Sequence, residues 1–424
     1  MELSKISSKP LHEVMPIVQL QVALQLCNID VAVPYIVGAP GGAKTAFINK
    51  MCREAGWNLA AVHFALNPIE EIGGLPLFNK VEFNGKQIDG TSWSLPDMLS
   101  KLYEIASNGK PTVFFLDDYH LCSPGHMSLG FEMFTERKLR GFKIPDNVGF
   151  VLAGNSSSKA GAKTIFSAIV NRCAMFPTHL SFDYWKENYA LKSGEEIMNL
   201  KTADVPVDMS AIMAKALSGV ENGISPKIVS FLSNEKYQKY FHEDEQVSQS
   251  WSSPRSWSRL SNMLVAMTAV NGNLTLDEIL YVAGGHVSNE AASDYAQYDL
   301  FFAKLELDKV FDDRKPIDIP SNMADRYIYI MASVAEFMSR LTIANRTETQ
   351  KESKDIQLKA RDKMSEIIHK MGLIAVELAV AGLKEIVINE KALKFKSSYP
   401  HIDKWLSNKD PEIYKKISYD IGVL

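Results

Sequence analysis

The chain has 424 residues, enough for two or three domains with a sizeable core, and 46% of them are hydrophobic and 23% charged. Its formal net charge of −4 does not favour nucleic acid or an anionic membrane as a partner of the whole surface. No apolar run reaches the roughly 18 residues of a membrane span, and the polar first ten residues lack a signal peptide's apolar core. The four cysteines show no CxxC spacing, which predicts reduced thiols in a cytoplasmic compartment rather than a metal site.

The first predicted elements form a strand, loop and helix. Residues 11–28 predict a helix that begins or breaks at Pro16. An apolar run at 34–37 then predicts a buried strand, a glycine-rich turn follows, and a helix is expected over 44–54. This order is the context of a phosphate-binding loop.

The glycine-rich turn GAPGGAKT matches the Walker A pattern, except that alanine precedes the lysine. Backbone N–H groups of such a loop, and the N-terminal end of the following helix, attract phosphate. We expect Lys44 to reach the β- and γ-phosphates of ATP and Thr45 to bind Mg²⁺ through its hydroxyl. Ala43 suits this loop if its φ is negative, since only a positive φ demands glycine. The predicted nucleotide-binding residues are Gly38, Ala39, Pro40, Gly41, Gly42, Ala43, Lys44 and Thr45.

Strand and helix patterns alternate up to about residue 182. Asn84-Gly85 inside VEFNGKQI predicts a β-hairpin over 81–88. The alternation predicts an α/β fold with a parallel sheet and crossover connections. Strands are expected at 58–66, 112–116, 148–153 and 174–176, and helices at 96–107 and 126–137.

The run TVFFLDD, residues 112–118, matches the Walker B pattern. Asp117 ends a buried strand at the edge where ligands bind in parallel sheets, so we expect it to hold Mg²⁺, through water. Asp118 stands where a glutamate usually orients the attacking water, and it is shorter by one methylene. Slow hydrolysis is therefore left open. The alternative is that both aspartates simply begin a solvated turn.

Beyond residue 182 helical periodicity dominates, with a boundary near 312–320. The expected division is an α/β ATPase core at 1–183, an α-helical lid at 184–310 and a helical C-terminal extension at 311–424. The charged run at 351–363 has interspersed signs and predicts a solvated helix face. Predicted helices lie at 209–218, 226–232, 254–269, 276–282, 324–343 and 352–383.

The ordered motifs resemble the AAA+ ATPases, in particular the MoxR-like branch, over residues 33–267. Besides the phosphate loop, the resemblance lies in LNPIEEIGGLPLF at 66–78, the stretch from LDD to AGN at 116–155, IFSAIVNRCAMF at 165–176 and SPRSW at 253–257.

The resemblance implies roles for three further polar residues. Asn155 corresponds to sensor 1, where a carboxamide can bond the γ-phosphate or the attacking water. Arg172 corresponds to an arginine finger that reaches the neighbouring subunit's nucleotide. An internal ion pair of Arg172, or a finger role for Arg137 or Arg140, are its alternatives. Arg255 corresponds to sensor 2, reaching back to its own subunit's phosphates, with a surface arginine as the alternative.

The resemblance also implies a homo-oligomeric ring, most simply a hexamer, that hydrolyses ATP with Mg²⁺. Its action would be chaperone-like remodelling of a protein partner, often one with a von Willebrand factor A domain. The hairpin at 81–88 falls where this branch carries an insert facing the pore or a partner, and a plain exposed turn is the alternative. A nucleic-acid-processing motor, and an ATP-dependent switch or scaffold with little turnover, remain as rival functions.

Overall fold

The computed structural model describes most of the chain as two compact units. The first unit comprises Met1–Ile224 and Tyr240–Ala296, and the second comprises Ser225–Lys239 and Gln297–Leu424. Much of the stretch expected to begin the lid, including the predicted helix at 209–218 apart from residues 213–214, lies outside the described residues. The described residues are 7–155, 167–185, 213–214, 224–234, 236–243, 250–347, 349–392 and 395–421.

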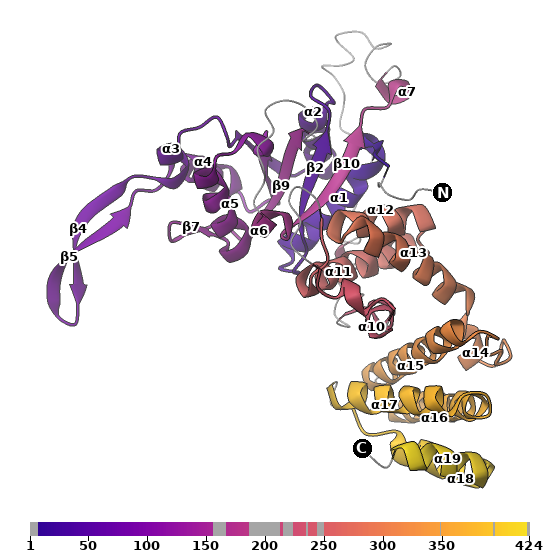
Figure 1. The fold of residues 1–424 in the computed structure, drawn as a ribbon. Coiled ribbons are helices and arrows are strands. Elements are labelled where there is room, and N and C mark those ends of the chain that lie inside the picture. The colour runs from indigo at the N-terminus through magenta and orange to yellow at the C-terminus, as the bar shows by residue number, and fades with distance from the viewer. Residues whose placement is uncertain are drawn as a thin grey trace. The chain divides into compact units, whose positions relative to one another are not determined.

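A six-stranded parallel sheet forms the centre of the first unit, with helices on both of its faces (Figure 1). The α/β fold predicted from the sequence is confirmed. Within each strand neighbouring side chains face opposite sides: Phe114 packs into one apolar core and Phe115 into the other, and both are fully buried. The strand order is β1 (Lys9–Pro10), β10 (Cys173–His179), β2 (Val33–Gly38), β9 (Val148–Asn155), β6 (Thr112–Asp117) and β3 (Asn58–His63).

Helices α1 and α2 belong to one of these cores, and α4 and α5 to the other. The helix α1 runs unbroken through Pro16, against the prediction of a break or start there. Pro16 is exposed and lies in the second turn, so only the bond to the carbonyl of His12 is lost. The bounds are α1 (Leu11–Leu26), α2 (Lys44–Ala55), α3 (Ile69–Gly73), α4 (Asp97–Ala106), α5 (Pro124–Glu136) and α6 (Ser167–Val170).

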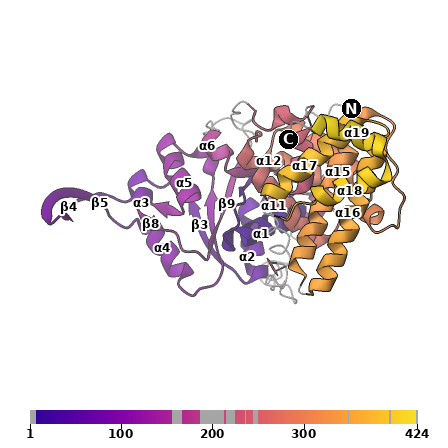
Figure 2. The same ribbon diagram turned by 90° about the horizontal axis from the view of Figure 1, so that it is seen from below.

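A long hairpin of β4 (Pro76–Phe83) and β5 (Lys86–Trp93) leaves the sheet next to α3 and α4, as both ribbon views show (Figures 1 and 2). Asn84 and Gly85 form its two-residue turn with φ of 51° and 75°, which confirms the predicted hairpin and extends it at both ends. Its strands carry exposed apolar side chains, with Phe78 89% exposed.

Helices α11 (Pro254–Asn271) and α12 (Leu276–His286) also belong to the first unit. The ring of Tyr281 in α12 stacks on Phe176 of β10, with centroids 5.7 Å apart. The helix α13 (Asn289–Lys304) then carries the chain into the second unit. The three-part division into core, lid and extension stays a prediction, because compact units do not by themselves define functional parts.

The described part of the second unit is entirely helical. The single helix predicted over 352–383 is wrong: α16 ends at Gly372, and α17 packs back on α15 and α16. A Cβ at residue 372 would lie 3.0 Å from Cδ1 of Ile417 in α19, so glycine permits α19 to pack closely on the end of α16. The bounds are α10 (Pro226–Ser233), α14 (Leu307–Phe311), α15 (Met323–Arg346), α16 (Gln350–Gly372), α17 (Val376–Ala392), α18 (Tyr399–Lys409) and α19 (Pro411–Ile421).

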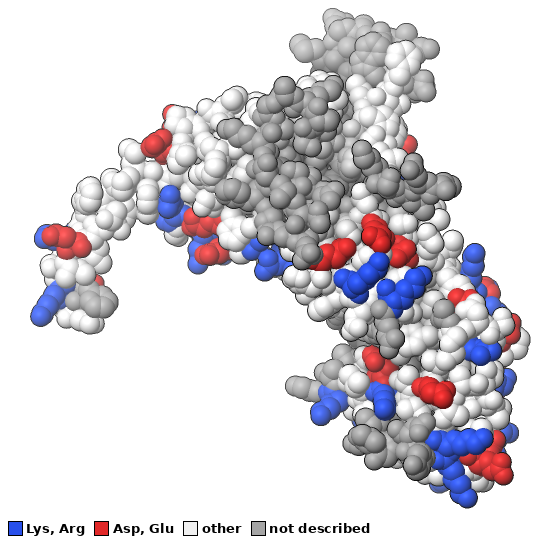
Figure 3. Space-filling view, viewed as in Figure 1, with Lys and Arg blue, Asp and Glu red and all other residues white. Residues whose placement is uncertain are grey.

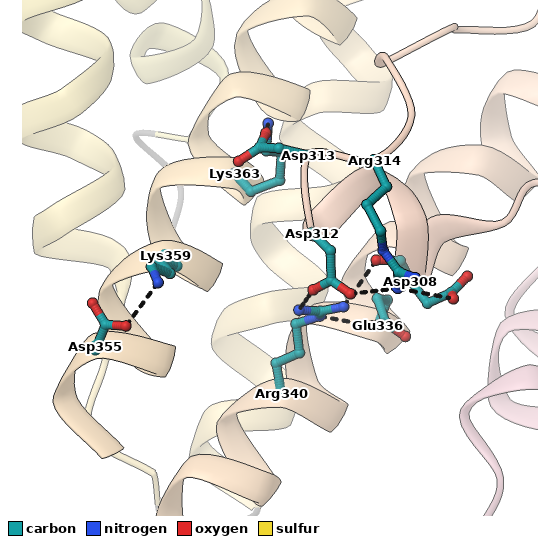
Figure 4. Close-up of polar contacts among 9 residues, drawn as sticks. All are labelled: Asp308, Asp312, Asp313, Arg314, Glu336, Arg340, Asp355, Lys359 and Lys363. Carbon is teal, nitrogen blue, oxygen red and sulfur yellow. Dashed lines mark hydrogen bonds and ion pairs between the residues drawn. The ribbon is translucent and has the colours of Figure 1, made fainter. Parts of the chain in front are cut away.

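Several ion pairs lie on the surface of this bundle. Arg340 of α15 bonds Asp312 and Glu336, as Figure 4 shows. On α16 Lys359 pairs with Asp355 at 2.8 Å, beside a groove of about 580 Å³. In the view of Figure 3 basic and acidic side chains lie beside one another. The run at 351–363 is thus a solvated, ion-paired helix face, as predicted. Among the described residues no helix has the length and apolarity to cross a membrane.

Candidate functional site

The glycine-rich loop joins the end of β2 to the start of α2, at the carboxyl edge of the sheet. Gly41 has a φ of 71°, in the left-handed region that favours glycine. A Cβ on Gly38 would lie 2.9 Å from the carbonyl oxygen of Thr178, so this position has no room for a side chain. No side chain caps α2 at Ala43, and the first-turn N–H groups of a helix have no partner within the helix. These donors form a ready anion site.

The expectation of a negative φ at Ala43 is wrong, because its φ is 61°. The residue is the left-handed N-cap of α2, which explains why glycine is usual before the lysine. The left-handed region costs a residue with a Cβ about 1–2 kcal/mol. The loop therefore adopts the same turn with alanine, and the backbone at Ala43 is strained.

Lys44 is buried at 7% exposure, and within the described part of the chain its ammonium group donates only to neutral oxygens. The acceptors are the carbonyls of Gly38 and Ala39, at 3.3 and 3.0 Å, and Oδ1 of Asn155 at 3.0 Å. Burial lowers the pKa of Lys44, and the charges of Asp117 and Asp118 oppose that shift. Among the described residues no carboxylate lies within ion-pair distance of this ammonium group, which leaves room for a bound anion.

Thr45 and Asp117 meet across the loop. The Thr45 hydroxyl donates to Oδ2 of Asp117 at 2.6 Å, and Asp117 is 7% exposed at the end of β6. A hydroxyl and a carboxylate are oxygen ligands suited to Mg²⁺, which keeps several waters and binds through one or two carboxylates plus substrate phosphates. No cluster of three or more metal-ligating side chains occurs in the described part of the chain. The two residues thus fit Mg²⁺ that is held together with a phosphate.

Asn155 ends β9 directly beside Gly38, its partner in the register. Its Oδ1 accepts from Lys44, and its Nδ2 lies 3.1 Å from Nε2 of His120. The structure thus brings the carboxamide to the lysine of the loop, where a γ-phosphate would lie.

Asp118 follows the strand with a φ of 51°, and its N–H donates to Oδ1 of Asp117 at 2.9 Å. Its carboxylate lies near two imidazoles: Nδ1 of His63 is 3.7 Å away and Nδ1 of His120 is 4.0 Å away. Sequence reasoning assigned neither histidine to the site: it noted that His120 lies near the Walker B run and interpreted it as structural. His63 ends β3 in register with Asp117, whereas the strand predicted over 58–66 placed that end three residues later.

Arg172 lies at the opposite, amino edge of the sheet, just before β10. It is 9% exposed, and it donates from Nε to Thr135 Oγ1 and from Nη1 to the carbonyl of Ala168, both at 2.7 Å. Its guanidinium lies 4.0 Å from the ring centroid of Phe131. Burial, and then the nearby Arg255 and Arg259, lower the pKa of Arg172 to about 10. In this arrangement Arg172 is engaged within its own chain.

Arg255 is exposed in the first turn of α11, near Arg172, and has no hydrogen bond or ion pair with a described residue. Ser253, the cap of that helix, accepts from Asn171 at 3.0 Å. Along β2 the amino edge at Val33 and the loop at Gly38 are five residue steps apart, roughly 17 Å at about 3.3 Å per residue. Arg255 is therefore not beside the phosphate loop of its own chain here.

The two alternative finger residues are also engaged in their own chain. Arg137 donates to the carbonyls of Pro145 and Val148 at 2.8 and 2.7 Å. Arg140 lies with its guanidinium 4.0 Å from the ring centroid of Trp93 in the hairpin. The assignment of a finger among these arginines stays a prediction.

Comparison with known proteins finds likeness to solved structures, two of which have low sequence identity to this chain. No protein-family model and no curated protein matches the chain. A crystal structure of a candidate ATPase from Cytophaga hutchinsonii is 14% identical, with a TM-score of 0.40, over 70% of this chain and 82% of that one. A full-length MCM homologue from Methanopyrus kandleri is 8% identical, with a TM-score of 0.30, over 66% of this chain and 53% of that one. Neither likeness, at these values, says what this chain does.

Proposed function

We propose that this chain binds ATP with Mg²⁺ and hydrolyses it. The observation that carries the proposal is Lys44, a buried ammonium group whose three acceptors are all neutral. Buried charges are usually paired, and this one lies beside the first turn of α2, whose N–H groups have no partner within the helix and no side-chain cap. A polyphosphate supplies the missing negative charge, and the strand–loop–helix context favours a nucleotide as its carrier.

The neighbouring residues have complementary tasks in this proposal. Lys44 and the loop N–H groups bind the β- and γ-phosphates, and Thr45 and Asp117 hold Mg²⁺, which neutralises charge on the phosphates. Asn155 contacts the γ-phosphate or the attacking water, and Asp118 orients that water. Because aspartate reaches less far than glutamate, a slow rate is expected.

The remaining part of the proposal concerns a neighbouring subunit. Arg172 and Arg255 lie together at the amino edge, away from the phosphate loop of their own chain. Their placement favours both arginines acting on the nucleotide of an adjacent copy, in a homo-oligomeric ring of six. The MoxR-like motifs add chaperone-like remodelling of a protein client, such as one with a von Willebrand factor A domain.

Two rival functions keep the same nucleotide site. A nucleic-acid-processing motor would show ATPase activity that is stimulated by DNA or RNA rather than by a protein. The interspersed charges on the face shown in Figure 3 do not favour it. A switch or scaffold with little turnover is favoured by Asp118 and by the strained Ala43. It would bind ATP and release almost no phosphate.

The test is phosphate release by the full chain with Mg²⁺ and ATP. We expect Lys44→Ala to lower it at least about 100-fold, because a preorganised charge at the transferring phosphoryl group is lost. The matched control is Lys50→Ala, further along α2, where the amine bonds Tyr184. Its rate should stay near wild type. A Lys44→Ala protein that releases phosphate as fast as wild type would contradict the proposal.

A further inference from the structure

His120 lies between the two polar groups that face the phosphate site. It belongs to the short turn η1 (Tyr119–Leu121) directly after β6 and is 5% exposed. One ring nitrogen faces Asn155 and the other faces Asp118. A polar ring buried at this place needs hydrogen-bond partners on both sides.

The hydrogen bonds of Asn155 identify the tautomer of His120. An ammonium group only donates, so the atom of Asn155 that faces Lys44 is the carbonyl oxygen Oδ1. The amide nitrogen Nδ2 therefore faces His120 and donates to Nε2 at 3.1 Å. Nε2 must accept, so the proton of the neutral imidazole is on Nδ1. Burial lowers the pKa of His120, which keeps the ring neutral near pH 7.

The Nδ1–H of this tautomer is buried and has no hydrogen-bond partner among the described residues. Leaving such a buried donor unpaired is unfavourable. The nearest carboxylate oxygen is Oδ1 of Asp118, at 4.0 Å. A shift of about 1 Å would bring the pair to hydrogen-bond distance. The other imidazole near Asp118, that of His63, has a side chain 59% exposed and can donate to water instead.

We propose that His120 is a positioning residue that holds Asn155 through Nε2 and fixes the Asp118 carboxylate through Nδ1–H when nucleotide is bound. The inference rests on the proposed ATPase function and adds a residue to it. It links Lys44, Asn155, His120 and Asp118 in one chain of hydrogen bonds. It also explains how a short aspartate can serve where glutamate is usual, since a neighbour fixes its position.

Two substitutions separate the two bonds of His120. The amide of His120→Asn places a donor near the position of Nδ1 but does not reach Asn155. The amide of His120→Gln places an acceptor near Nε2 but has no donor for Asp118. We expect His120→Gln to lower kcat about 10- to 100-fold, as is usual when a group that orients a site residue is removed. His120→Asn should stay within about threefold of wild type, and KM for ATP should change little in both.

The matched control is His126→Gln, because His126 is equally buried but bonds Ser123 and the carbonyl of Asn67. Its kcat should stay near wild type even if the melting temperature falls. Two results overturn the inference. One is a wild-type kcat in His120→Gln, and the other is an equal loss of kcat in both His120 variants together with an equal loss of melting temperature.

A measurement without turnover keeps the inference separate from the proposed function. In full-length protein labelled with ¹⁵N-histidine, the His120 signal is the one that His120→Gln removes. We expect the Nδ1–H tautomer between pH 6 and 8. Adding Mg²⁺ and the β,γ-imido analogue of ATP should move its Nδ1–H resonance in wild type but not in Asp118→Ala. An Nε2–H tautomer, or a resonance that the analogue leaves unmoved in wild type, would overturn the inference even if the protein hydrolyses no ATP.

Discussion

The two edges of the parallel sheet differ in how many of the expected site contacts they make within one chain. At the carboxyl edge Lys44 bonds Asn155 and Thr45 bonds Asp117, so the first two residues of α2 already contact the last residues of β9 and β6. At the amino edge Arg172 is buried in its own chain, and the exposed Arg255 has no bonded partner among the described residues. One chain thus brings together the residues proposed to bind phosphate and Mg²⁺, but it does not make the expected arginine contacts.

The difference follows from the topology. Parallel strands have their carboxyl ends at the same edge of the sheet. The residues that end the neighbouring strands β2, β9 and β6 therefore lie close together in any such sheet. Arg172 precedes its strand and therefore lies at the other edge. Only another chain, or a large rearrangement, can bring such a residue to a nucleotide.

The largest expected effect is that of removing Arg172, which tests whether the amino edge of one subunit acts on the nucleotide of its neighbour. Arg172→Ala should lower phosphate release about 1000-fold, as is typical of arginine fingers. Mixed with Lys44→Ala, it should regain activity, because each variant supplies the edge that the other lacks. Phosphate release by the mixture, measured against each variant alone, decides this.

Three companion variants sharpen that result. Arg255→Ala should behave like Arg172→Ala in the mixing experiment if both arginines act in trans. Arg137→Ala and Arg140→Ala test the two alternative finger residues. We expect both variants to be less stable than wild type and to gain no activity when they are mixed with Lys44→Ala. A mixture no more active than its components would show that the amino edge does not complete a neighbour's site.

The second effect concerns how α11, which carries Arg255, is held to the sheet through α12. His286 of α12 is 3% exposed, and burial lowers its pKa from 6.5 to about 4. The unfolded chain binds the proton more tightly, so stability is full above pH 6.5 and is lost as the pH falls toward 4. Between pH 7.5 and 5 this histidine should cost about 2 kcal/mol of unfolding free energy.

Urea unfolding at both pH values checks this expectation. The control is His286→Asn, which keeps a donor for the carbonyl of Val282 but does not titrate. It should lose about 2 kcal/mol less than wild type on acidification. Equal losses in the two proteins would mean that His286 is solvated or already partnered.

The smallest effect concerns strain within the carboxyl edge. At a φ of 61° glycine relieves about 1–2 kcal/mol of strain, against about 0.5–1 kcal/mol of extra chain entropy in the unfolded state. Ala43→Gly should therefore stabilise the protein slightly in thermal unfolding. Ala46→Gly, inside α2, should instead cost about 1 kcal/mol. Similar losses in both variants would argue for an ordinary helical backbone at residue 43.

Much of the carboxyl edge could be predicted from the sequence. The apolar runs before Gly38, Asp117 and Asn155 predict buried parallel strands, and strand polarity then places all three residues at one edge. The α/β fold, the hairpin turn at Asn84-Gly85 and the solvated face of α16 follow from equally local patterns.

Tertiary structure alone decided the rest, because it depends on segments far apart in the chain. The place of His120 between Asn155 and Asp118 requires β6 and β9 to be neighbours, and no local pattern marks it. The burial of Arg172 depends on Phe131 and Thr135 of α5. The φ of Ala43 is determined by the turn between β2 and α2, which are both packed in the core. The residue type at position 43 does not by itself reveal the strain in that turn.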